Sequence, residues 1–198
     1  MHSPKDLSSL AARDFQHMRH YTRFRGGAAA DALCAVIIGE EKLPLELALY
    51  QPDIPQNTGS LLRLGACLGI PVHIIHPTGF GFSDKSLRRA GMDYLEHAEI
   101  IEHTSFAVFE ADRRARGRRL VLLTTKASQS AYTQSYSDDD ILMVGRESAG
   151  VPEAVASDAD LRVRIPMQPG LRSINVALAA TLELGEAMRQ TGQFATLV

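Results

Sequence analysis

Polar side chains that could do chemistry gather in three short segments, and each segment follows an apolar run. The first carries Asn57 and Arg63, the second carries Glu147, and the third carries Ser173 and Asn175. Amide, carboxylate and hydroxyl groups can orient a polar ligand, and the planar fork of an arginine can grip a phosphate or orient a hydroxyl group. Backbone groups at the ends of strands are also free to meet a ligand, so the three segments predict one pocket.

The second segment is a glycine-rich turn directly after the apolar run 142–144. Gly145 and Gly150 bracket Arg146, Glu147 and two small residues. A glycine at the end of a strand lets the backbone come close to a planar ligand. The turn lacks the GKS or GKT ending of a phosphate-binding loop, and it lacks the GxGxxG pattern of a nicotinamide site. A different ligand loop and a plain turn with solvated charges both fit the local pattern.

The third segment begins with apolar residues and then turns polar. Ile165 and Met167 follow a charged strand and should place apolar atoms beside the pocket. Pro166 and Pro169 stiffen the loop, which lowers the entropy cost of ordering it around a ligand. Ser173 stands before a long helix-like pattern, so its hydroxyl is a candidate N-cap of that helix.

Strand-like and helix-like patterns alternate from residue 45 onward, which predicts βαβ units and a mostly parallel sheet with helices on both faces. Asn57 is a candidate N-cap of the first helix, Gly69 a stop signal for it, and Gly117 a candidate C-cap of a later one. The expected strands are 45–50, 72–75, 120–124, 141–144 and 161–165, and the expected helices are 58–68, 83–90, 105–116 and 173–190.

Composition fits an ordinary globular domain of the α/β class. A chain of 198 residues suits one domain, and a formal net charge of −2 does not by itself announce a nucleic-acid binder. Cys34 and Cys67 lie far apart without CxxC spacing, which argues against disulfides or zinc and favours a cytoplasmic location. His73 and His76 would point to opposite faces of a strand, so we expect no metal site. No apolar stretch reaches membrane-spanning length, so we expect no membrane association.

Residues 1–43 need a separate interpretation. Arginines precede an apolar stretch at 28–39, as in a signal peptide, but Asp31 interrupts the stretch and charged residues follow it directly. We therefore expect an N-terminal extension that is either mobile or an artefact of start-site choice. The globular domain is expected at residues 44–198.

In order and spacing, the three segments resemble those of the SPOUT class of RNA methyltransferases, and most closely the TrmL (YibK-like) tRNA 2'-O-methyltransferases. The resemblance runs from about residue 45 to residue 192. It implies an α/β fold whose C-terminal third is tied into a deep trefoil knot, and a homodimer. It also implies S-adenosylmethionine as cofactor and methylation of the ribose 2'-oxygen at wobble position 34 of the tRNA anticodon loop.

The resemblance assigns roles to particular residues. It places Arg63 at the reaction centre, where we expect it to position the nucleophile and stabilise negative charge, because a guanidinium stays protonated and makes a poor general base. Asn57, Glu147, Ser173 and Asn175 are the expected supports of Arg63. The residues expected to hold the cofactor are Leu123, Thr124, Gly145, Gly150, Ile165, Met167 and Ser173.

Two departures from the family pattern keep alternatives open. Arg146 stands where close relatives often have proline or serine, and Ala177 stands where they usually have a second serine. These changes leave room for a non-catalytic RNA-binding protein on the same fold. A 2'-O-methyltransferase acting on ribosomal RNA is a third reading. The basic run 113–119 either helps to hold RNA phosphates or is a solvated helix end.

Overall fold

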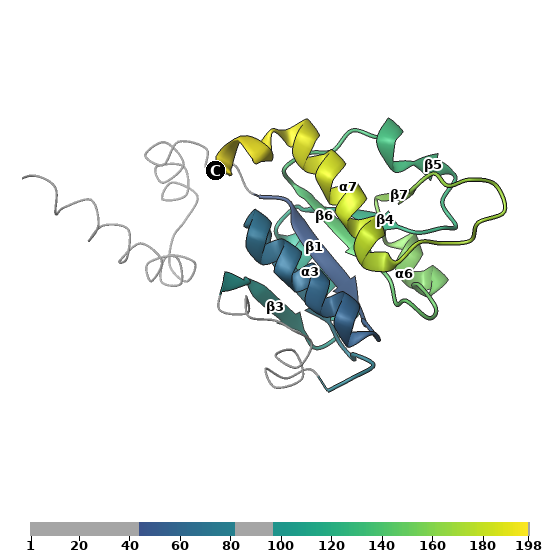
Figure 1. Ribbon diagram of the computed structural model, residues 1–198. Coiled ribbons are helices and arrows are strands. Elements are labelled where there is room, and N and C mark those ends of the chain that lie inside the picture. The colour runs from purple at the N-terminus through teal and green to yellow at the C-terminus, as the bar shows by residue number, and fades with distance from the viewer. Residues whose placement is uncertain (1–43, 82–96, 198) are drawn as a thin grey trace, which may run out of the picture. The chain divides into compact units, whose positions relative to one another are not determined.

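The computed structural model describes residues 44–81 and 97–197 (Figure 1). The expected extension at 1–43 and the expected helix at 83–90 lie outside these ranges. Within them a parallel sheet has the strand order β3-β2-β1-β6-β4-β7-β5. Its strands are β1 Glu46–Tyr50, β2 Val72–Ile75, β3 Ile100–His103, β4 Arg119–Leu123, β5 Gln129–Ser130, β6 Asp140–Val144 and β7 Leu161–Arg164.

Helices cover both faces of this sheet, as expected from the alternating pattern. The α-helices are α3 Pro55–Leu68, α5 Phe106–Ala115, α6 Glu153–Ser157 and α7 Val176–Thr191, and two 3-10 turns are η2 Ala131–Thr133 and η3 Gln193–Thr196. Figure 1 shows α3 and α7 running side by side across one face, and these two helices contact each other. No helix in the described ranges is both long and apolar enough to cross a bilayer.

Side chains of the central strands alternate between two apolar cores. Leu47 and Leu49 of β1 belong to the core under α3 and α7. Ala48 and Tyr50 point the other way, into the core that contains Phe109 of α5. Both sets are buried, because a parallel sheet carries helices on each face and its strands therefore read as continuous apolar runs.

The first helix begins earlier than the sequence pattern indicated. Its N-cap is Ile54 and Pro55 stands in the first turn, so the prediction that Asn57 caps the helix was wrong. Proline suits this position because its fixed φ is helical and its missing N–H would have had no partner there. Asn57 consequently lies within the first turn, with its amide available to other loops. Gly69 ends the helix in the left-handed conformation with φ 66°, as expected.

The last helix begins later than expected. Asn175 is the N-cap of α7, and its Oδ1 accepts the backbone N–H groups of Ala177 at 2.9 Å and Leu178 at 3.3 Å. The alternative that Ser173 caps this helix was therefore wrong, because residues 171–175 form a loop. At the end of α5 the C-cap is Arg116, and Gly117 follows it with φ 66°.

Candidate functional site

A hollow of about 650 Å³ opens at the carboxyl-terminal ends of β4, β6 and β7. Its wall combines apolar side chains from the strand ends with polar groups from the following loops. The lining residues are Ile54, Asn57, Leu122, Leu123, Thr124, Thr125, Lys126, Val144, Gly145, Arg146, Glu147, Ser148, Ala149, Gly150, Val151, Ile165, Met167, Arg172, Ser173, Ile174, Asn175, Val176 and Ala179. Carboxyl ends of parallel strands are where open α/β sheets place their ligands.

The structure brings almost all the expected site residues to this hollow. All three sequence segments reach it, together with Leu123 and Thr124 at the end of β4. Arg63 is the exception. It lies on the exposed side of α3 and lines a neighbouring hollow of about 560 Å³ between α3 and α7. Asn57 and Asn175 line both hollows, so they form the boundary between them.

A chain of hydrogen bonds joins these segments. The Nδ2 of Asn175 donates to Oδ1 of Asn57 at 2.9 Å, and Nδ2 of Asn57 donates to Oε1 of Glu147 at 3.1 Å. The other oxygen of Glu147 accepts the backbone N–H of Asp53 at 3.2 Å. The start of α7, the first turn of α3 and the loop after β6 are thereby held in one arrangement.

The loop after β6 is closed by backbone contacts that require glycine at both ends. Arg146 and Gly150 exchange two backbone hydrogen bonds, of 3.2 and 2.8 Å. Gly150 has φ 67°, which non-glycine residues rarely adopt. A Cβ on Gly145 would lie 2.6 Å from the carbonyl carbon of Gly150. Because this closure leaves no room for a side chain at position 145, Gly145 presents bare backbone to the hollow.

Two carboxyl groups lie together behind this loop. Burial raises the pKa of Glu147, and the neighbouring Asp53 carboxyl raises it further. The interaction with Glu147 lowers the pKa of Asp53, and a hydrogen bond donated by the Ser148 hydroxyl adds to that effect. Within this pair Asp53 is therefore the stronger acid and Glu147 the weaker one.

Sequence reasoning missed several residues of this site. Asp53 contacts the loop after β6 through both side chain and backbone. Gln51 has φ 46°, and its Oε1 accepts from Arg146 Nη2 while its Nε2 donates to the His76 carbonyl at 3.4 Å. Their position between β1 and α3 was a signal, because this loop ends at the same sheet edge as the others. Their contacts depend on tertiary placement that the local pattern does not carry.

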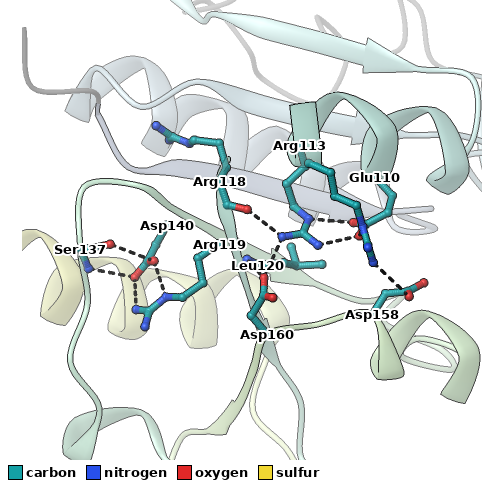
Figure 2. A network of polar contacts seen from close by, with 10 residues as sticks. Glu110, Arg113, Arg118, Arg119, Leu120, Ser137, Asp140, Asp158 and Asp160 are labelled. Atoms are coloured by element: carbon teal, nitrogen blue, oxygen red, sulfur yellow. Dashed lines mark hydrogen bonds and ion pairs between the residues drawn. The ribbon is translucent and has the colours of Figure 1, made fainter. Parts of the chain in front are cut away.

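The basic run 113–119 takes no part in the hollow. Every arginine in it meets at least one carboxylate, with nitrogen–oxygen distances from 2.5 to 3.6 Å. The pairs are Arg113 with Glu110 and Asp160, Arg114 with Glu110 and Asp158, Arg116 with Glu46 and Asp112, Arg118 with Glu46, and Arg119 with Asp140. Figure 2 shows much of this network. These contacts favour a structural role over a grip on RNA phosphates.

The histidines of the sheet belong to the same structural network. His73 contacts His103 at 2.8 Å through one ring nitrogen and Glu46 at 2.8 Å through the other. Burial would raise the pKa of Glu46, but hydrogen bonds from His73 and Arg116 outweigh it and lower the pKa to about 2. In the described part of the chain, histidine, cysteine and acidic side chains form no group of three that could hold a metal ion.

The hollow can therefore bind a ligand of moderate size that has a planar part and polar ends. Apolar strand ends and the bare backbone at Gly145 suit the planar part. The Asn175–Asn57–Glu147 chain offers fixed hydrogen-bonding groups at the edge of the hollow. Lys126 and Arg172 add positive charge to its lining, which suits an anionic partner.

The chain is similar to several known proteins. Residues 44–184 match the model of the SpoU rRNA Methylase family. A protein of Beijerinckia indica named tRNA (cytidine(34)-2'-O)-methyltransferase is 58% identical over 152 residues, which cover 77% of this chain and 95% of that protein.

Two solved structures extend the comparison. A structure described as "Structural insights into the 2-OH methylation of C/U34 on tRNA" has a TM-score of 0.70 and 40% identity, covering 75% of this chain and 97% of its own. The SpoU methyltransferase AviRb from Streptomyces viridochromogenes, in complex with AdoMet, has a TM-score of 0.66 and 27% identity, covering 78% of this chain and 63% of its own. The family match and these relatives together show that this chain belongs to the SpoU rRNA methylase family.

Proposed function

We propose that this protein transfers a methyl group from S-adenosylmethionine to the ribose 2'-oxygen of nucleotide 34 in the tRNA anticodon loop. The observation that carries the proposal is the convergence of three sequence segments on one hollow, in a chain 58% identical to a methyltransferase of that name. An anticodon loop suits the chemistry because its riboses are exposed without melting a duplex.

The hollow fits the proposed cofactor. Its volume of about 650 Å³ lies in the range of ligand pockets, and its lining mixes apolar strand ends with loop backbone. The tight closure at Gly145 leaves backbone rather than a side chain facing the ligand. The residues that would hold the cofactor are Leu123, Thr124, Gly145, Gly150, Ile165, Met167 and Ser173. When bound, S-adenosylmethionine supplies a methyl group activated by a sulfonium.

The residues of the protein have mainly to align the ribose oxygen and stabilise its developing charge. The Asn175–Asn57–Glu147 chain fixes polar groups at the boundary between the two hollows. Arg63 lies in the second hollow beside the same two asparagines. Its guanidinium keeps its proton, so we assign it to orienting the oxygen nucleophile and offsetting negative charge.

We also propose that the protein is a homodimer in which a second copy covers the α3–α7 face. Leu178 is 61% exposed and lines the second hollow, and Leu171 is 66% exposed in the loop before α7. Ile174 and Leu182 are exposed nearby along the same stretch of chain. Large apolar side chains in such a group favour a protein interface. Light scattering should give the mass of a dimer for the wild type and of a monomer for Leu178→Glu, whereas a monomeric wild type would reject this interface.

Three further assignments complete the proposal. The family match at residues 44–184 supports a methyltransferase domain at 44–198. Residues 1–43 lie outside the match, and we assign them to an N-terminal extension. The deep trefoil knot of the C-terminal third stays a prediction carried by family resemblance. A tRNA substrate would place the enzyme in the cytoplasm.

Transfer of a labelled methyl group tests the activity directly. The protein is incubated with labelled S-adenosylmethionine and tRNA that lacks modification at position 34, and nucleosides are then identified by mass spectrometry. We expect 2'-O-methylcytidine or 2'-O-methyluridine from position 34 and none from the same tRNA carrying a 2'-deoxy nucleotide there. RNA binding without transfer would support the non-catalytic alternative, and transfer only to ribosomal RNA would support the third reading.

Replacement of Arg63 tests its role. Arg63→Ala should bind S-adenosylmethionine like the wild type, because Arg63 lies outside the first hollow. Turnover should fall by roughly a hundredfold or more, as when a group that stabilises transition-state charge is removed. Ser60→Ala on the same exposed face of α3 is the matched control. Wild-type turnover by Arg63→Ala would contradict the assigned role.

A further inference from the structure

Asp53 makes reciprocal contacts with the loop after β6. Its Oδ1 accepts the backbone N–H of Glu147 at 3.1 Å, and its own backbone N–H donates to Oε2 of Glu147 at 3.2 Å. Its second oxygen, Oδ2, accepts the hydroxyl of Ser148. Each of these two acidic residues therefore holds the backbone of the other, and three hydrogen bonds join the β1–α3 loop to the loop that lines the first hollow.

The position of Asp53 is also fixed by contacts with the chain after β2. The backbone N–H of Gly79 donates to the carbonyl of Pro52 at 2.9 Å. A Cβ on Gly79 would lie 2.6 Å from Cβ of Asp53, so the chain after β2 packs directly against the Asp53 side chain. Pro52 is buried as well. Asp53 is therefore a rigid support and not a surface acid that happens to meet a neighbour.

The effect of this support reaches the boundary between the two hollows. Glu147 uses its remaining oxygen to accept from Asn57, which in turn accepts from Asn175 at the start of α7. If the loop 147–148 shifted, the Glu147 carboxyl would leave Asn57, and the asparagine pair would lose its anchor. A displacement of about 1 Å in such a group costs up to about a hundredfold in rate.

We infer that Asp53 is a positioning residue that sets both the shape of the cofactor loop and the placement of Glu147, Asn57 and Asn175. The inference rests on the proposed function, because it assigns Asp53 to the methyl-transfer site. Nothing in the local pattern around Asp53 marked it for this role, and it acts through Glu147 and the 147–148 backbone.

The charge of Asp53 provides a readout that a purely structural support would not have. The Asp53 carboxyl raises the pKa of Glu147, and burial acts in the same direction. The other charged groups facing this region are Arg146 on the same loop, Lys126 after β4 and Arg172 before α7, which line the same hollow. Replacing the Asp53 carboxylate with a neutral amide should therefore lower the pKa of Glu147.

Two variants of Asp53 separate the effect of its hydrogen bonds from the effect of its charge. In Asp53→Asn the amide oxygen can still accept from the Glu147 backbone, and its N–H₂ can donate to the Ser148 hydroxyl oxygen. In Asp53→Ala both side-chain contacts of residue 53 are lost. Asp112→Asn is the matched control, because Asp112 is also a half-buried carboxylate, but its partner is Arg116 and it belongs to the network around α5.

The experiment measures affinity for S-adenosylmethionine by calorimetry from pH 4 to pH 9, a range that includes the ordinary glutamate pKa value of 4.5, and single-turnover methyl transfer to tRNA under the same conditions. Asp53→Ala should lose roughly tenfold or more in affinity and in the transfer rate. Asp53→Asn should stay near wild type in affinity at neutral pH, but the midpoint of its pH dependence should move to lower pH. Asp112→Asn should change neither.

The outcomes decide clearly. Asp53→Ala with wild-type affinity and rate, or Asp53→Asn with an unshifted midpoint, would overturn the role of Asp53. A melting curve checks that each variant is folded, and Asp53→Asn keeps the test valid if Asp53→Ala does not fold. If the wild type binds S-adenosylmethionine but methylates no tRNA, the proposed function fails, while the calorimetric comparison still tests Asp53.

Discussion

Polar side chains serve different purposes at the two ends of the sheet. Before the strands begin, the arginines of 113–119 are bound to carboxylates, and some of them are deeply buried. After the strands end, a smaller set of amides, glycines and the Glu147 carboxyl lines an open hollow, and Asp53 supports the loop that carries Glu147. The arginine-rich end has more charged side chains, but they pair with one another. The hollow is where hydrogen-bonding groups and bare backbone face a ligand.

The contrast teaches that a dense run of charge in a sequence does not locate a nucleic-acid surface. Arg113 is 4% exposed, and it donates to Glu110, Asp160 and the carbonyl of Arg118. Desolvating a guanidinium is costly, so a buried arginine needs such partners to be tolerated. The arginines of this run therefore stabilise the junction between α5 and the sheet.

Unlike the paired acids of the arginine-rich end, Glu183 is buried without a hydrogen-bond partner among the described residues. Its replacement gives the largest effect on unfolding free energy that we expect. Glu183 is fully buried on α7 near Tyr136 and Asp140. Burial raises its pKa to about 8; the nearby Tyr136 hydroxyl opposes this shift, and the charge of Asp140 adds a smaller contribution in the same direction as burial. The folded protein thus keeps this proton at pH values where the unfolded chain releases it.

The pH dependence of Glu183→Gln tests that assignment. Between the ordinary value of 4.5 and about 8, the wild type should lose about 1.4 kcal/mol of unfolding free energy per pH unit relative to the variant. Below this window the difference should be constant, and above it both states are ionised and the difference should level off. Urea unfolding at several pH values measures it. A difference that does not change with pH would show that Glu183 is not buried as a neutral acid.

Removal of an acid from the arginine-rich end should destabilise the protein without disturbing the hollow. Glu46 accepts from His73 and Arg116, and it lies 3.2 Å from Arg118, which is also buried. Glu46→Ala leaves Arg116 and Arg118 without this carboxylate and should cost about 3 kcal/mol of unfolding free energy. Affinity for S-adenosylmethionine, measured well below the melting temperature, should stay at the wild-type value. A loss of affinity with unchanged stability would mean that the two ends are not independent.

The opposite result is expected at the hollow. In Gly145→Ala the new Cβ would lie 2.6 Å from the carbonyl carbon of Gly150, so the loop must open and move from its position. We expect a loss of roughly a hundredfold in methyl transfer efficiency, with a change in unfolding free energy of about 1 kcal/mol or less. A methyl-transfer assay with tRNA and a urea curve on the same preparation measure both. Gly185→Ala is the control, because a Cβ there meets nothing within 4 Å.

The sequence was informative about the elements that bury apolar residues and less so about how loops meet. The strands around Leu47 and Leu142 and the stop at Gly69 were predicted because apolar runs and a left-handed glycine are local signals. The strand Ile100–His103 was missed because it is short and only partly buried, and Gln129–Ser130 because it is shorter still.

In the site, too, the positions of segments along the chain were predictable and the contacts between loops were not. Convergence of the three segments was predicted from their positions after strands, and the structure places them in one hollow. Both predicted N-caps failed, because Pro55 already starts α3 and Asn175 is better placed than Ser173 to start α7. The predicted C-cap Gly117 was also wrong, because Arg116 caps α5 and Gly117 follows it. The role of Asp53 could not be predicted, because its partner Glu147 is distant in the sequence and the contact depends on how two loops are held together.

The smallest expected effects are on RNA binding. They test whether a single arginine at each end of the sheet contacts RNA. Arg114 has the most exposed side chain of the arginine run, at 63%, and it contacts Glu110. Arg172 lines the hollow. If the arginine run is structural, Arg114→Ala should leave tRNA affinity and its salt dependence unchanged and alter stability by less than about 1 kcal/mol. Arg172→Ala should reduce the slope of log affinity against log salt by about one, as for the loss of one phosphate contact. Fluorescence titrations of tRNA at several salt concentrations measure both slopes. If Arg114→Ala reduced the slope and Arg172→Ala did not, the RNA-binding surface would belong to the arginine-rich end, and the contrast between the two ends of the sheet would be reversed.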